Sequence, residues 1–124
     1  LIMFDYICET PVALRKIIEN RKEIADEFVK YYKDKEIEQI YVIGSGTSYH
    51  AGLAAKVFLE EIFGKKVFCM YPTQFARAEK VFCKKTLVIG MSQGGQSFST
   101  VEGLESAKRA LYSSCFRKSY STDF

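Results

Sequence analysis

The sequence has few of the residues that hold metal ions. Its 124 residues include one histidine, and none of its four cysteines stands in C-x-x-C spacing. Structural zinc sites take four such ligands at short spacings, so we expect no metal. Cys69 and Cys83 lie in or beside apolar runs, where a thiol usually fills core space. A reduced, cytoplasmic chain is the simplest interpretation.

Long apolar runs and blocks of one charge are also missing. No run approaches the roughly 18 residues that a membrane span needs, and the apolar start, residues 1–6, contains Asp5 and has no basic leader. The 18 basic and 15 acidic residues give a net charge of +3 and are mixed along the chain, as in residues 33–36, K-D-K-E. Such mixing is typical of a solvated helix face rather than a nucleic-acid patch. We therefore expect neither a membrane nor a nucleic acid as partner.

The composition that remains suits one folded domain. Hydrophobic residues make up 48% of the chain, which is enough for a core and argues against disorder. Thr10 and Pro11 are typical of a helix start. An apolar stripe at helical spacing follows to about Lys33, with an interruption at Asn20. We expect this stripe to be packed in a core.

Apolar runs and helical patterns alternate over the rest of the chain. Residues 40–43, 67–71 and 86–91 are predicted strands, and helices are predicted at 48–63, at 74–79 and from 98 onwards. Gly64 should end the first of these helices. The alternation is typical of an α/β fold, an open parallel sheet with flanking helices. In such sheets, ligands bind where the carboxyl ends of strands meet the amino ends of helices.

Two unusual turns follow the first and third predicted strands. The first, residues 44–52, contains Gly46, Thr47 and Ser48, whose backbone N–H groups and hydroxyls suit an anion with several oxygens. The second, residues 92–100, is rich in hydroxyls and amides and has no charged side chain. Either turn alone would fit an ordinary helix start. Together, at one edge of the sheet, they favour a phosphate-ester site.

A nucleotide site fits these turns less well. Tyr49 stands where a dinucleotide fingerprint has its third glycine, and Tyr71 and Pro72 end the second strand where an acidic ribose ligand should stand. The sequence contains no G-K-[ST], which excludes a P-loop. A nucleotide-binding domain is therefore a disfavoured alternative, and no cofactor is expected.

Both turns resemble motifs of the SIS (sugar isomerase) domain family. Residues 46–52, G-T-S-Y-H-A-G, look like its first sugar-phosphate motif, and residues 91–97, M-S-Q-G-G-Q-S, resemble its second, S-Q-S-G-E-T. The segment from Tyr6 to Arg21 also resembles the helix that precedes these domains. The resemblance covers roughly residues 4–110. It is closest to the isomerase domain of glutamine:fructose-6-phosphate aminotransferases and to fructosamine-6-phosphate deglycases.

The resemblance implies a role for each motif residue. The implied substrate-binding residues are Gly46, Thr47, Ser48, Ser92, Gln93, Gly94 and Ser97. The three serines and Gln93 would bind the phosphate, and Thr47 would contact the sugar. Gly94 replaces a family serine and so loses a hydroxyl, and Gln96 replaces a glutamate and so removes a negative charge. His50 is expected mainly as a helix-face residue.

The resemblance also implies that part of the domain is missing. The family has five parallel strands in the order 2-1-3-4-5, so three recognisable strands indicate a truncated, flavodoxin-like SIS domain. The expected organisation is an N-terminal helical segment (1–36), a partial SIS domain (37–110) and an atypical tail (111–124). The family's catalytic glutamate, histidine and lysine would lie beyond residue 110, which leaves the catalytic residues unknown and enzyme activity open. We expect the uncovered sheet edge to favour homo-oligomers.

The sequence therefore predicts a module that binds a carbohydrate derivative. Fructose 6-phosphate and glucosamine 6-phosphate are the expected ligands, as in isomerases or isomerising aminotransferases of amino sugar metabolism, and the site is expected to be catalytically incomplete. Two alternatives remain open. One is a non-catalytic sugar-phosphate sensor, which a basic DNA-binding segment would favour. The other is a fragment of a fructosamine-6-phosphate deglycase.

Overall fold

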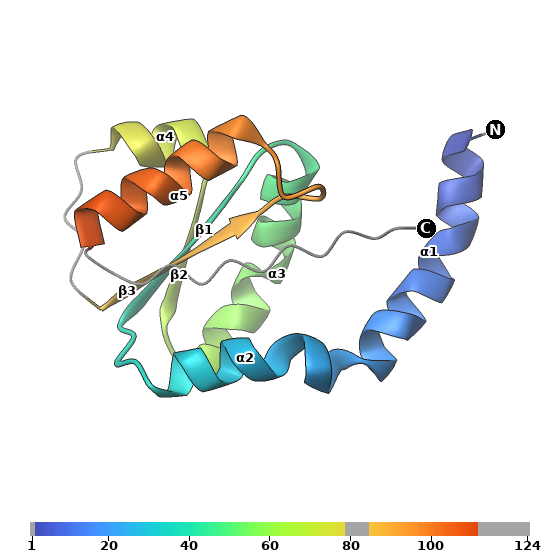
Figure 1. The fold of residues 1–124 in the computed structure, drawn as a ribbon, viewed down its shortest axis with the longest axis horizontal. Helices are drawn as coiled ribbons and strands as arrows, with labels where there is room; N and C mark the ends of the chain where they lie inside the picture. The colour runs from blue at the N-terminus through green and yellow to red at the C-terminus, as the bar shows by residue number, and fades with distance from the viewer. Residues whose placement is uncertain (1, 79–84, 112–124) are drawn as a thin grey trace. The chain divides into compact units, whose positions relative to one another are not determined.

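A computed structural model describes residues 2–78 and 85–111 of the chain (Figure 1). The chain divides into two compact units, Leu1–Lys35 and Glu36–Phe124. The N-terminal unit consists of helix α1 (Ile2–Glu19) and helix α2 (Arg21–Lys33), which are separated by a turn at Asn20 as the sequence predicts.

The N-terminal helix differs from the prediction in two ways. It begins at Ile2, so Thr10 and Pro11 lie inside it, and the Thr10 hydroxyl donates to the Tyr6 carbonyl at 2.9 Å instead of capping a helix start. Proline at this point removes one N–H donor without ending the helix. The prediction of a packed core was also wrong here: no residue of α1 or α2 is buried, and Leu14 and Ile17 are about half exposed. Two helices by themselves do not enclose a core.

The second unit is built on a parallel sheet of three strands. The strands are β1 (Gln39–Gly44), β2 (Lys66–Met70) and β3 (Thr86–Met91). Their order is β2-β1-β3, and Ile40 of β1 lies opposite both Val67 and Leu87. The central strand is buried on both faces, which explains its continuous apolar run. The open α/β sheet that the sequence predicts is confirmed, and β3 is an edge of the described sheet.

Helices cover both faces of this sheet. Helix α3 (Thr47–Phe63) lies on one face, and α4 (Pro72–Arg77) and α5 (Phe98–Leu111) lie side by side on the other (Figure 1). Helix α3 ends at Gly64, whose left-handed φ of 60° is the predicted glycine stop. Helix α4 begins two residues earlier than expected, because Pro72 occupies its first turn and Tyr71 becomes its N-cap.

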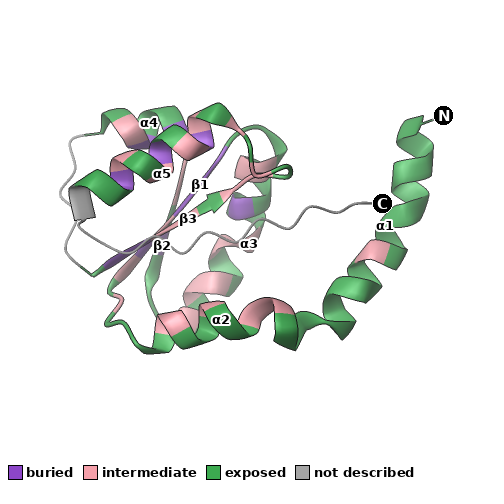
Figure 2. Cartoon of the chain, in the orientation of Figure 1, coloured by how far each residue is buried: buried purple, intermediate pink, exposed green. Residues whose placement is uncertain are grey.

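The core of the second unit lies between the sheet and the α4–α5 pair (Figure 2). Phe75 and Ile43 are fully buried there beside Ala107. Helix α5 packs closely because Gly103 has no side chain: a Cβ there would lie 2.8 Å from Cδ1 of Ile43. Since truncating a buried phenylalanine typically costs about 3–5 kcal/mol, Phe75 is a main anchor of this layer.

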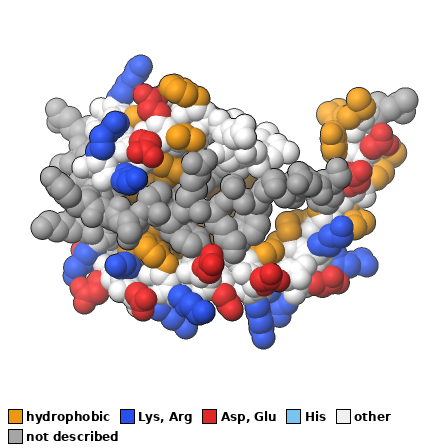
Figure 3. Space-filling model, viewed as in Figure 1, with side chains coloured by type: hydrophobic (Ala, Val, Ile, Leu, Met, Phe, Trp, Pro, Cys, Tyr) orange, Lys and Arg blue, Asp and Glu red, His pale blue; other side chains and the backbone are white. Residues whose placement is uncertain are grey.

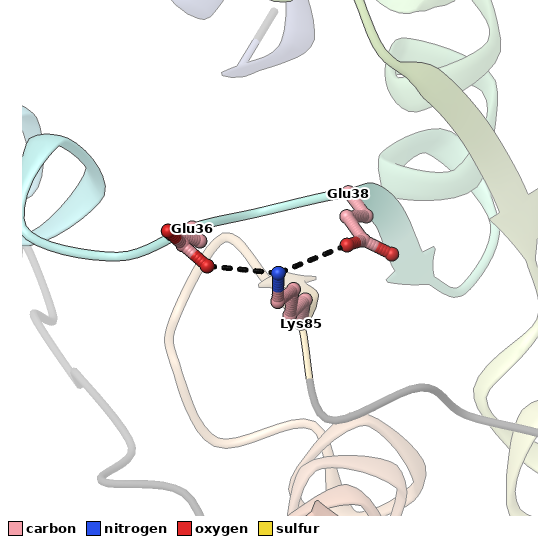
Figure 4. Close-up of polar contacts among 3 residues, drawn as sticks. All are labelled: Glu36, Glu38 and Lys85. Atoms are coloured by element: carbon pink, nitrogen blue, oxygen red, sulfur yellow. Dashed lines mark ion pairs between the residues drawn. The ribbon is translucent and has the colours of Figure 1, made fainter.

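An ion-pair cluster joins the amino ends of β1 and β3. Lys85 Nζ lies 2.8 Å from Glu36 Oε2 and 3.2 Å from Glu38 Oε1, and the Glu38 N–H donates to the Lys85 carbonyl at 2.8 Å (Figure 4). The hydrogen bond and the charge of Lys85 lower the pKa of Glu36, and the two glutamates raise the pKa of Lys85. This cluster lies at the amino ends of the strands, whereas the two polar turns follow their carboxyl ends.

The charged side chains of both signs are interspersed on the face drawn in Figure 3, as the sequence predicts. Among the described helices, none is both long and apolar enough to cross a membrane.

Candidate functional site

The first polar turn is a tight bend between β1 and α3. Gly46 has a φ of 56°, a left-handed conformation that a residue with a side chain adopts only with strain. The Ser48 N–H donates to the Ser45 carbonyl at 3.2 Å, and the His50 N–H donates to the Gly46 carbonyl at 3.2 Å. The first turn of α3 therefore starts directly at the end of β1, where its amino end offers donors and a positive dipole.

The second polar turn joins β3 to α5. The Gly95 N–H donates to the Ser92 carbonyl at 3.4 Å, and Gly95 has a φ of 66°. Before this turn, Gly90 lets α5 approach the strand: a Cβ on Gly90 would lie 2.7 Å from Cδ1 of Leu104 and 3.2 Å from Cγ2 of Thr100.

The two turns meet at the same edge because β1 and β3 are parallel neighbours. Gly44, the last residue of β1, lies opposite Met91, the last residue of β3. The hydroxyls of Ser45 and Ser99 are 3.1 Å apart and form a hydrogen bond between the turns. The sequence predicts both turns at the carboxyl ends of the strands. The turns lie side by side because β1 and β3 are neighbours in the sheet.

A shallow, open cavity of about 530 Å³ lies between the turns. It is lined by Thr47, Ser48, Ala51, Gly90, Met91, Ser92 and Gln93. Four of the seven residues implied by the resemblance thus lie around one cavity. Among the described residues, no charged side chain lines it, so its polar groups are neutral hydroxyls and an amide.

The other three implied residues are not part of the cavity lining. Gly46 is the N-cap of α3, and Gly94 is in the turn after Ser92, with open space where a Cβ would stand. Ser97 immediately precedes α5, and its hydroxyl accepts a hydrogen bond from Thr100 Oγ1 at 3.2 Å. The Ser97 oxygen also lies 3.4 Å from the Ser99 oxygen, and either hydroxyl can donate in that contact.

Sequence reasoning left three lining residues out of the site: Gly90, which has no side chain, and the apolar residues Ala51 and Met91. Ala51 lies one helical turn after Thr47 and so shares its face of α3, a spacing that could have identified it. Met91 directly precedes Ser92 at the end of β3. Both offer apolar surface next to the hydroxyls.

Three further candidates, His50, Tyr49 and Cys69, lie outside the lining. His50 is exposed, and its ring centroid lies 5.5 Å from that of Tyr49. The Tyr49 ring in turn stacks on Tyr71, which directly follows β2, with the centroids 4.2 Å apart. Burial raises the pKa of the Cys69 thiol, with Lys56 opposing this effect and Glu60 adding to it. A thiol with a raised pKa ionises less readily and is a poorer nucleophile, which disfavours Cys69 as a catalytic group.

The family model of the SIS domain matches residues 34–111, which include both turns and all three strands. The chain belongs to the SIS domain family. This SIS domain spans about a fifth of the length of the curated relatives it matches. It is 31% identical over 109 residues to the glutamine–fructose-6-phosphate aminotransferase of Fusobacterium nucleatum, covering 75% of this chain and 18% of the relative. The Aquifex aeolicus enzyme of the same name is 33% identical over 106 residues, covering 86% of this chain and 18% of that relative.

Solved structures resemble the SIS domain in fold as well. A candidate phosphosugar isomerase from Clostridium difficile superimposes with a TM-score of 0.75 at 36% identity, covering 86% of this chain and 30% of that one. A candidate sugar-binding protein from Salmonella typhimurium gives a TM-score of 0.72 at 30% identity, covering 90% of this chain and 34% of that one. The family and the fold predicted from the two motifs are thereby confirmed.

Proposed function

We propose that this SIS domain binds a phosphorylated sugar between its two polar turns. The observation that carries the proposal is the convergence of Thr47, Ser48, Ser92 and Gln93 on one cavity, from turns that are 44 or more residues apart in the chain. Two strands, two turns and two helix starts all contribute to that one edge. Relatives with sugar phosphates in their names support the ligand class.

Neutral donors are well suited to the phosphate. Hydrogen bonds to a charged group contribute about 1.5–3 kcal/mol each, more than bonds between neutral groups. The amino end of α3 adds a favourable dipole at the same place. Apolar surface from Ala51 and Met91 would lie against the carbon skeleton of the sugar.

We infer that the described site binds its ligand without completing a reaction. Interconversion of a ketose phosphate and an aldose phosphate needs a base that moves a proton between neighbouring carbons. Among the described residues, no carboxylate, histidine or lysine lines the cavity. In this proposal the binding part is the segment 37–110, and the N-terminal helical segment, 1–36, takes no part in the site. Of the predicted tail, 112–124 lie outside the described residues.

Titration calorimetry with fructose 6-phosphate and glucosamine 6-phosphate tests the proposal, with fructose as the unphosphorylated control. We expect saturable binding of at least one phosphate with millimolar or lower Kd, and no binding of fructose. Equal heats from fructose and its phosphate would show that the turns do not recognise phosphate.

A further inference from the structure

A row of four hydroxyls runs across the carboxyl edge of the sheet. The Ser45 and Ser99 oxygens are 3.1 Å apart, the Ser99 and Ser97 oxygens are 3.4 Å apart, and Thr100 Oγ1 donates to Ser97 Oγ at 3.2 Å. Ser45 belongs to the turn after β1, whereas the other three belong to the start of α5. The row therefore connects the two turns that flank the cavity.

The direction of these bonds matters because a hydroxyl has only one proton. Thr100 is 3% exposed, and a buried hydroxyl in a native fold nearly always has a partner. By donating to Ser97, Thr100 fills one acceptor position of the Ser97 oxygen. The Ser97 oxygen has a second contact, with the Ser99 oxygen at 3.4 Å, in which either hydroxyl can donate, and this distance is long for an O–H···O bond. A phosphate oxygen would be a stronger acceptor than Ser99.

We infer that Thr100 and Ser99 are positioning residues for the phosphate site. Thr100 keeps Ser97 as a hydrogen-bond donor to the ligand, and Ser99 ties the second turn to Ser45 in the first. The inference rests on the proposed function. Groups that are oriented before the ligand arrives lose less entropy on binding, so Thr100 and Ser99 would raise affinity without contacting the ligand themselves.

The bond from Thr100 to Ser97 also lies at the start of α5, where it could serve only to stabilise the helix. The two roles differ in what the loss of this bond changes. Loss of a bond that only stabilises the helix lowers the melting temperature of Thr100→Val and leaves the ligand affinity of the folded chain unchanged. Loss of a positioning bond weakens ligand binding by the folded chain, and it does so only while Ser97 keeps its hydroxyl.

The experiment is a double-mutant cycle on binding of fructose 6-phosphate to the 124-residue chain, repeated with inorganic phosphate. We expect Ser97→Ala to weaken binding about tenfold and Thr100→Val about five- to tenfold. Thr100→Ser, which keeps the hydroxyl, should stay within about twofold of wild type. The double variant of Thr100→Val and Ser97→Ala should match Ser97→Ala alone. Thr10→Val is the control, because it removes a hydroxyl from α1.

Ser99→Ala is a second test that leaves the buried residue Thr100 unchanged. Ser99 is half-buried and alanine is a good helix former, so this variant should fold and still bind several times more weakly than wild type. Unchanged affinity in Thr100→Val and Ser99→Ala, or multiplied losses in the double variant, would overturn the inference alone. A wild-type chain that binds none of fructose 6-phosphate, glucosamine 6-phosphate and inorganic phosphate would overturn the proposed function and this inference together.

Discussion

The Lys85 ammonium lies 2.8 Å from a carboxylate oxygen of Glu36 and holds the start of β3 against the segment that leads into β1 (Figure 4). The pair is open to water, since the Lys85 side chain is 45% exposed and that of Glu36 is 84% exposed. Exposed pairs of this kind contribute little individually. A second carboxylate, Glu38, lies within 3.2 Å and makes the contact a small network.

We expect acid to weaken this network. The hydrogen bond and the charge of Lys85 lower the pKa of Glu36. The contribution of Glu36 to stability is therefore complete above the ordinary glutamate pKa of about 4.3 and is lost as the pH falls through the lowered pKa. The raised pKa of Lys85 sets the opposite limit: its contribution is complete below about 10.4 and is lost as the pH rises through the raised value. Melting temperatures of wild type and Glu36→Gln should therefore converge on acidification. Parallel curves would contradict this, and high salt should shrink the difference at neutral pH.

Ser92→Ala should weaken sugar-phosphate binding by about 1.5–3 kcal/mol, the scale of one hydrogen bond to a charged group. Ser92 lines the cavity directly after β3, so its hydroxyl is placed to donate to the phosphate. Calorimetry of the variant against wild type measures the loss. The control is Thr73→Ala, which removes an exposed hydroxyl from α4. An affinity that is the same in all three proteins would remove Ser92 from the site.

Gly94→Ser should add the hydroxyl that the motif resemblance implies at this position and tighten binding up to about tenfold. No atom lies within 4 Å of where its Cβ would stand, and Gly94 is not among the described glycines with positive φ, so the backbone accepts a side chain. The free energy of unfolding should change by no more than about 0.5 kcal/mol. Gly94→Ala separates the hydroxyl from the added carbon and should leave affinity unchanged. A gain in both variants would point to backbone stiffening instead.

Gly90→Ala should destabilise the second unit by about 1–3 kcal/mol, the usual cost of overpacking. The new Cβ would lie 2.7 Å from Cδ1 of Leu104 and 3.2 Å from Cγ2 of Thr100, so α5 or the Leu104 side chain must move. Urea unfolding measures the change, with Gly94→Ala as the matched control in open space. An unchanged midpoint would show that Leu104 moves aside at no cost.

The chain should self-associate. Strand β3 is an edge of the described sheet, and α3 exposes Val57, Phe58 and Ile62 at 61–65% each. Unpaired strand edges and clustered apolar side chains both favour association. Light scattering over a concentration series should show a mass that rises with concentration. A constant monomer mass with a single cooperative melt would show that the chain closes its own core.

Much of the fold and of the site was predictable because the relevant signals are local. A continuous apolar run such as that of β1 marks a buried parallel strand, and Gly64 marks a helix end through its backbone conformation. The start of α1 was not predictable from Thr10 and Pro11, because a threonine hydroxyl bonds equally well to a carbonyl four residues earlier in a helix that is already formed.

The sequence by itself determined the three strands, the two polar turns after β1 and β3, and the family to which the motifs point. These depend on residue type and spacing within short segments. Only the tertiary structure decided that Ser45 and Ser99, 54 positions apart, form a hydrogen bond, and that Ala51 and Met91 join the cavity lining. Such contacts depend on which strands are neighbours and how closely α5 packs on Gly90, and that geometry arises only when the sheet and its helices assemble.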